Sequence, residues 1–131
     1  MATKQEQEKK VLEFHILNSQ LEQYQNQLVN LQQQKQNLNN LSSSLEEIKK
    51  LKTGDEFLSP LSSGVLVKTE LKEPGKILMT VGANVIVKKR IEDAELSIKE
   101  QEKNITLLIS QLKSEAEKIA GAVYSLQQEL E

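Results

Sequence analysis

Apolar residues in the first part of the chain recur at alternating intervals of three and four. The series comprises Phe14, Leu17, Leu21, Tyr24, Leu28 and Leu31. This spacing places the side chains at a and d positions of a heptad, on the face of a helix that packs against another helix. Lys35 takes the next a position, and the series continues with Leu38, Leu41, Leu45 and Ile48. The step from Leu38 to Leu41 is three where four is due, which indicates local overwinding.

The last part of the chain carries a stricter repeat. Its a positions are Ile91, Ile98, Ile105, Leu112, Ile119 and Leu126, and its d positions are Ala94, Gln101, Leu108, Glu115, Ala122 and Glu129. Apolar character moves to the e positions further along, at Ile109, Ala116, Val123 and Leu130. We therefore predict a second long helix, folded back on the first to form an antiparallel two-helix coiled coil.

Residues that break helices are concentrated between these two parts. Both prolines and four of the five glycines lie between positions 54 and 82. We predict a first helical segment over 1–53, with Gly54 as its C-terminal stop, and a second over 89–131. The segment 54–88 has the alternation and turn residues of four short strands, over 56–61, 65–71, 76–81 and 85–88. The pattern predicts two β-hairpins in a single α+β domain that is mainly α.

Two short hairpins need further β structure to bury their apolar residues, and their edges carry unpaired backbone groups. We therefore expect the hairpins to join subunits. The residues expected at these contacts are Phe57, Leu58, Leu61, Val65, Val67, Leu71, Ile77, Met79, Val81, Val85 and Val87. The alternative is a small independent sheet resting on the coiled coil.

Several apolar residues near the two termini fall outside the a and d positions. Leu12, Ile16 and Tyr124 fall at outward-facing positions, flanked by Val11, Val123 and Leu130. Exposed apolar groups gathered at one end of a helix pair are candidates for a contact surface. The alternatives are ordinary surface residues or a frayed helix end. Gly121 lies close to the same end and lowers helix stability by about 1 kcal/mol relative to Ala.

Composition narrows the function classes. The 131 residues have a formal net charge of −2, with acidic and basic residues interspersed, which does not favour binding to nucleic acid. No apolar run approaches the roughly 18 residues that span a bilayer, and cysteine is absent. These features predict a soluble, unsecreted, cytoplasmic protein without nucleic-acid or membrane partners.

No constellation of catalytic or metal-binding residues is present in the sequence. His15 is the only histidine, and neither GxGxxG nor GxxxxGK[ST] occurs. The carboxylate pairs Glu46-Glu47 and Glu92-Asp93 fall on helix surfaces. We expect no enzymatic activity, no cofactor and no metal.

The run from Gly54 to Ala94, GDEFLSPLSSGVLVKTELKEPGKILMTVGANVIVKKRIEDA, resembles the alpha subunit of archaeal prefoldins. The most specific matching segments are Gly54-Asp55-Glu56, Pro60-Leu61, Gly64-Val65 and Val81-Gly82. The order helix, two hairpins, helix is also that of the alpha class. Arg90 departs from the pattern, because relatives often have Ser or Thr there as a helix N-cap.

The resemblance implies a hexamer of two alpha and four beta subunits, in which the hairpins join into an intersubunit β-barrel. It also implies ATP-independent binding of unfolded proteins at the coiled-coil tips and their delivery to a group II chaperonin. One alternative is a structural filament, as formed by the alpha-like gamma prefoldins. A nucleic-acid-binding coiled coil is a third hypothesis, disfavoured by the charge pattern.

Overall fold

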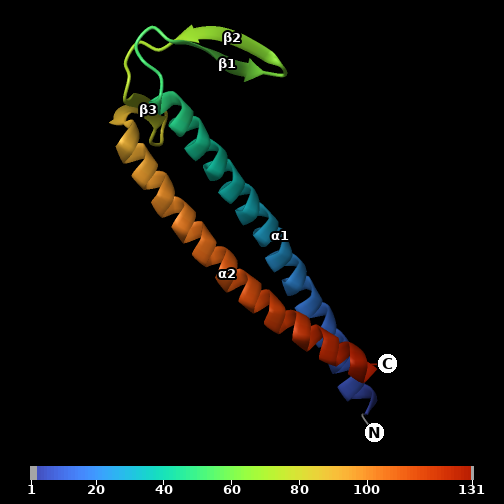
Figure 1. Cartoon of the computed structure of the whole chain (residues 1–131). Coiled ribbons are helices and arrows are strands. Elements are labelled where there is room, and N and C mark those ends of the chain that lie inside the picture. The colour runs from blue at the N-terminus through green and yellow to red at the C-terminus, as the bar shows by residue number, and fades with distance from the viewer. Residues whose placement is uncertain (1–2, 131) are drawn as a thin grey trace. The chain divides into compact units, whose positions relative to one another are not determined.

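A computed structural model describes residues 3–130 and contains two long helices and two hairpins in this range (Figure 1). The elements are α1 (Lys4–Lys49), β1 (Glu56–Ser62), β2 (Val65–Glu70), β3 (Lys76–Thr80), β4 (Ile86–Arg90) and α2 (Ile91–Leu130). The predicted mainly α, α+β fold is confirmed. The chain divides into two compact units: the arm unit, Met1–Asn37 with Lys103–Glu131, and the hairpin unit, Leu38–Glu102.

Helix α1 begins with a capping box. The backbone N–H of Glu6 donates to Oγ1 of Thr3 (3.2 Å), and the N–H of Thr3 donates to Oε2 of Glu6 (3.3 Å). This reciprocal pair satisfies two backbone donors that a helix start leaves without partners.

The predicted role of Gly54 as a helix stop is wrong. Helix α1 ends at Lys49, where the N–H groups of Lys50 and Leu51 bond to carbonyls three residues back. Gly54 has φ +91° and its N–H donates to the carbonyl of Leu71 (2.8 Å). Its left-handed backbone therefore opens the first hairpin instead of closing the helix.

Strands β1 and β2 form an antiparallel hairpin in which Phe57 faces Thr69 and Ser59 faces Val67. The turn places Ser63 at φ 48° and Gly64 at φ 82°, the positive values of a primed hairpin turn. The register shifts between Pro60 and Ser62, which marks an irregularity at the turn end of the ladder.

Strands β3 and β4 form the second antiparallel hairpin, with Ile77 opposite Lys89 and Met79 opposite Val87. Strand β4 runs to Arg90, two residues beyond the predicted end, and α2 starts at the next residue. In place of an N-cap, Nε and Nη2 of Arg90 each donate to one carboxylate oxygen of Asp93 at 3.2 Å. The N–H of Ile91 donates to the carbonyl of Gly75 (3.0 Å).

The core of the hairpin unit lies where α1, α2 and β3 meet. Its buried residues are Leu45, Ile91, Ala94 and Ile98, and the partly buried residues packed against them are Leu38, Ile48, Ile77 and Met79. Because β-strand side chains alternate between faces, Ile77 and Met79 point to this cluster together. The inner face of the second hairpin is thus occupied by the chain's own helices.

The predicted place of Leu41 in the helix seam is wrong. Leu41 is 43% exposed, whereas Ser42 is half-buried. The covered residue after Leu38 is therefore Ser42, four positions further on, as the heptad requires. Leu41 instead borders a small cavity together with Ile77 and Met79 of β3. The three-residue slip falls later, between Leu45 and Ile48, which are both covered.

In the arm unit, α1 and α2 pack through the stripes that the heptads predict, with one offset. The α1 residues from Phe14 to Leu31 at a and d positions are half-buried. On α2 the covered residues are Ile105, Ile109, Leu112, Ala116, Ile119, Val123, Leu126 and Leu130. The apolar side of α2 therefore follows its a and e positions, and Leu108, Glu115, Ala122 and Glu129 at d are exposed.

Truncation of Ile91 is expected to destabilise the chain. Ile91 is completely buried, so Ile91→Ala removes packed methylene groups and should lower the free energy of unfolding by about 2–5 kcal/mol. Leu96→Ala is the control, because Leu96 lies on the same helix and is 66% exposed. Urea denaturation followed by circular dichroism measures both, and equal losses would contradict this account of the core.

Candidate interaction surfaces

One end of the arm unit exposes apolar side chains. Nζ of Lys10 lies 3.2 Å from Oε2 of Glu129, an ion pair that joins the start of α1 to the end of α2. Val11, Leu12 and Ile16 follow Lys10 on α1, and Tyr124 precedes Glu129 on α2; all four are exposed, Leu12 to 61% and Tyr124 to 63%. We call these four residues the end patch. Val123 and Leu130, predicted beside them, are half-buried and belong to the packed stripe of α2.

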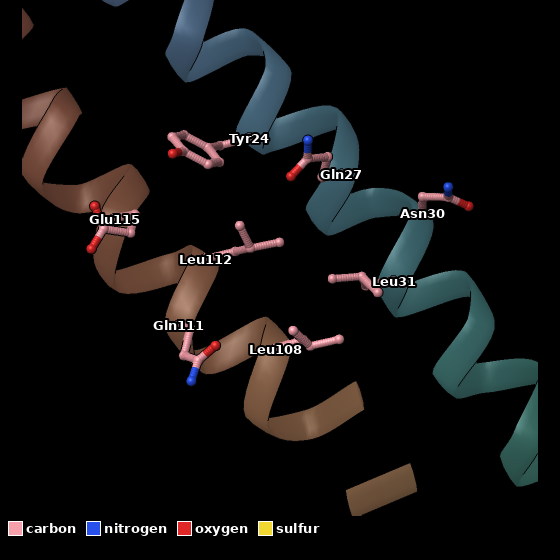
Figure 2. Close-up of a pocket in the computed structure, with 8 residues that line it drawn as sticks. All are labelled: Tyr24, Gln27, Asn30, Leu31, Leu108, Gln111, Leu112 and Glu115. Atoms are coloured by element: carbon pink, nitrogen blue, oxygen red, sulfur yellow. The ribbon is translucent and has the colours of Figure 1, made fainter. Parts of the chain in front are cut away.

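A groove of about 600 Å³ lies between the helices of the arm unit (Figure 2). Its apolar residues are Tyr24 and Leu31 of α1 and Leu108 and Leu112 of α2, and its polar residues are Gln27, Asn30, Gln111 and Glu115. Figure 2 shows the Leu31 and Leu112 side chains extended toward each other across this space. This groove was not predicted from the sequence. Its signal was the shift of apolar residues from d to e on α2.

The hairpins expose a second set of apolar residues. Among the residues predicted to join subunits, Leu58, Leu61, Val65, Val67, Val81 and Val85 are exposed, and Phe57, Leu71, Ile77, Met79 and Val87 are half-buried. Ile77 and Met79 pack against the chain's own core. Sequence reasoning missed Leu66, Leu78 and Ile86, which are exposed as well. They lie at alternate positions to the residues chosen, on the opposite faces of their strands.

Polar groups hold the first hairpin together across its strands. The hydroxyl of Thr69 donates to the carbonyl of Phe57 (2.9 Å) and lies 2.9 Å from the hydroxyl of Ser59. Buried or half-buried hydroxyls are usually paired in this way. These contacts add to the ladder that joins β1 and β2 at the pair Phe57–Thr69.

An ion pair joins the two helices in the hairpin unit. Nζ of Lys49 donates to Oε1 of Glu95 at 3.0 Å. Hydrogen bonding with Glu46, and then with Lys49, lowers the pKa of Glu95. The hydrogen bond and the negative charge of Glu95 raise the pKa of Lys49.

The described residues contain no group of three or more His, Cys, Asp or Glu side chains placed to hold a metal ion. His15 contacts the ring of Phe14 edge to face, with ring centroids 5.8 Å apart. Between residues 3 and 130, neither helix combines the length and apolar character that crossing a membrane requires.

A family model described as "Prefoldin subunit" matches residues 17–131. The chain belongs to the prefoldin family. A prefoldin subunit alpha of Methanococcus vannielii is 31% identical over 107 residues, covering 76% of this chain and 73% of the relative. A prefoldin subunit alpha of Archaeoglobus fulgidus is 24% identical over 135 residues, covering 98% of both chains.

The fold also matches a solved structure described as filamentous PFD from Methanocaldococcus jannaschii. The TM-score is 0.74 at 20% sequence identity, covering 88% of this chain and 95% of that chain. The resemblance to archaeal prefoldin alpha chains is therefore confirmed by sequence, and the prefoldin fold by structure. Prefoldin membership implies a chaperone-type function and assembly with other prefoldin subunits, and prefoldins are not an enzyme family.

The lowered pKa of Glu95 predicts a pH-dependent contribution to the stability of this prefoldin chain. Ionised Glu95 stabilises the fold above its ordinary pKa of 4.5, and this contribution is lost as the pH falls through the lower folded value. We expect Glu95→Gln to lower the Tm near neutral pH, and the difference from wild type to shrink on acidification. Thermal melts across this range measure the effect. Glu100→Gln, an exposed position on α2, is the control, and a difference independent of pH would contradict the assignment.

Proposed function

We propose that the chain is a subunit of a cytoplasmic hetero-hexamer of two alpha and four beta prefoldin subunits. The hexamer binds unfolded proteins without ATP and delivers them to a group II chaperonin. The observation that carries this proposal is the end patch, where apolar side chains stay exposed although the packing of the helices does not require them there. Exposed apolar surface of this kind marks a site of contact with other proteins.

The hairpins support a role in assembly. In the described part of the chain each sheet has only two strands, β1 with β2 and β3 with β4. The outer edges of such sheets carry backbone groups that strands of other subunits can pair with. Leu58, Leu66 and Leu78 are more than half exposed, so joining these sheets to others would also bury apolar area.

A client that is bound by several weak contacts can be both held and released. Each end patch exposes few side chains, so one contact with a client is weak. When several subunits engage one unfolded chain, avidity rises by roughly 10²–10⁴, while each contact still breaks readily. This arrangement favours temporary holding over permanent binding.

The end patch is tested by a double variant, Leu12→Gln with Tyr124→Gln. We expect the assembled variant to need roughly tenfold more protein to suppress aggregation of a chemically denatured client, because lost contacts reduce avidity multiplicatively. The control is Val29→Gln with Leu96→Gln, which removes two apolar groups of similar exposure, 67% and 66%, from the same helices. Light scattering measures suppression, and mass measurement verifies assembly. Equal suppression by both variants would exclude the end patch as the client site.

A second candidate function is a structural filament built through the hairpins. The similarity to a prefoldin chain described as filamentous favours this candidate. Electron microscopy of the isolated chain, paired with mass measurement after mixing with a prefoldin beta subunit, separates the two. A discrete hexamer supports the chaperone proposal. Long filaments that persist in the presence of the beta subunit support the structural one.

A further inference from the structure

The two hairpins carry opposite charges at their open ends, which are the ends away from the turns. In the first hairpin Glu56 lies directly opposite Glu70, and in the second Lys76 lies directly opposite Arg90. All four residues are exposed, and Arg90 is also bonded to Asp93. Like charges directly opposite each other destabilise a sheet. An acidic open end placed beside a basic open end would relieve the repulsion in both hairpins.

The backbone of each hairpin shows which groups face outward. The N–H of Leu71 donates to the carbonyl of Asp55, and the N–H of Ile91 donates to the carbonyl of Gly75, each at 3.0 Å. Bonded and non-bonded pairs alternate along an antiparallel ladder, so every second residue directs its N–H and C=O away from the hairpin. With the observed registers, the outward residues are Leu66, Lys68 and Glu70 on β2 and Lys76, Leu78 and Thr80 on β3.

The remaining strand edges suit β2 less well as partners. Strand β1 has Pro60 at an outward position, where proline lacks the N–H that a neighbouring strand would bond. Strand β4 has Lys88 and Arg90 at outward positions, and full antiparallel overlap of β2 with β4 would set Lys68 opposite Lys88. The same overlap of β2 with another β2 would set Lys68 opposite itself. Strand β3 places no charge opposite Lys68.

We propose that β2 pairs antiparallel with β3 of a second copy of this chain, with Glu70 opposite Lys76 of that copy. In this register, two acidic residues and then two basic residues lie in one row across the four strands β1, β2, β3 and β4. Apolar side chains also meet on one face, because Val65 lies beside Val81 and Val67 beside Met79 of the second copy. The other opposed pairs, β2 residue first, are Leu66 with Thr80, Lys68 with Leu78, and Thr69 with Ile77.

The occupant of the β2 edge is a second copy because the chain does not use its own β3 there. Within the described residues, β2 and β3 belong to separate two-stranded sheets. Each copy can give β2 to one ladder and β3 to the other, and such exchange of identical elements is a low-cost route to dimers. The inference rests on the proposed assembly through the hairpins and names the strand edges and charges that select the partner.

The test reverses one charge at a time, in Glu70→Lys and in Lys76→Glu. Within its own hairpin each change replaces a like-charge pair by an opposite pair, so the hairpin is not weakened. Between copies each change sets like charges opposite each other in both ladders. We expect roughly tenfold weaker self-association at low salt, measured by analytical ultracentrifugation. The control is Glu56→Lys, which relieves the same pair from the β1 side and should change self-association less than twofold.

Mixing the two single variants tests whether the contact joins two copies. The Glu70→Lys chain is basic at both positions and the Lys76→Glu chain is acidic at both, so both ladders of a mixed dimer regain opposite charges. We expect the mixture to recover a species of twice the 14.8 kDa chain mass. Pairing of β2 with β3 inside one chain gains nothing from mixing, so weakened variants without recovery would overturn the proposal. Wild-type association of both single variants, or a wild-type chain that does not self-associate, would also overturn it.

The same variants, mixed with a prefoldin beta subunit, separate this inference from the proposed function. If each single variant forms the hexamer as readily as wild type, the pairing of β2 with β3 is wrong and the hexamer proposal stands. If wild type forms no hexamer but mixing the single variants restores the dimer, the hexamer proposal is wrong and the strand pairing stands.

Discussion

The burial of Ile91, Ala94 and Ile98 against Leu45 is the contact on which the hairpin unit depends. These residues form one cluster of buried side chains, and Ile77 and Met79 of β3 pack directly onto it. A two-helix protein has little interior, so each of these side chains contributes a large share of the apolar surface that the unit buries. The inner face of the second hairpin is committed to this cluster, so the apolar residues that the two sheets expose lie on its outer face, at its turn and on the first hairpin.

The arm unit differs from the hairpin unit, because its helices pack along their length with few buried residues. Among the described residues of this unit, Ile109 and Ala116 are buried, and the rest of the stripe is half-covered. Ala116 at an e position of α2 is buried, whereas Leu108 at a d position is left exposed. This asymmetry leaves a partly apolar groove between the helices of the arm unit.

Sequence periodicity predicted both helices and both hairpins, because long heptads and turn residues depend on local spacing. It misplaced Leu41, since whether Leu41 or Ser42 faces α2 depends on β3 packing alongside, which no local pattern reports. It also misread Gly54, because a glycine with positive φ serves a helix end and a hairpin start equally well. Leu66, Leu78 and Ile86 were missed because the alternation pattern was used to choose one apolar face of each strand, whereas these strands carry exposed apolar residues on both faces.

Strand β4 passes into α2 without an intervening residue, Arg90 being the last of one element and Ile91 the first of the next. The Ile91 N–H is bonded to Gly75 at the start of the same hairpin, and Arg90 is clamped to Asp93 in the first turn of the helix. The second hairpin and the start of α2 therefore have no hinge between them. A neighbouring strand that twists β4 must turn the first residues of α2 with it, so contacts at the sheet are mechanically transmitted to the helix.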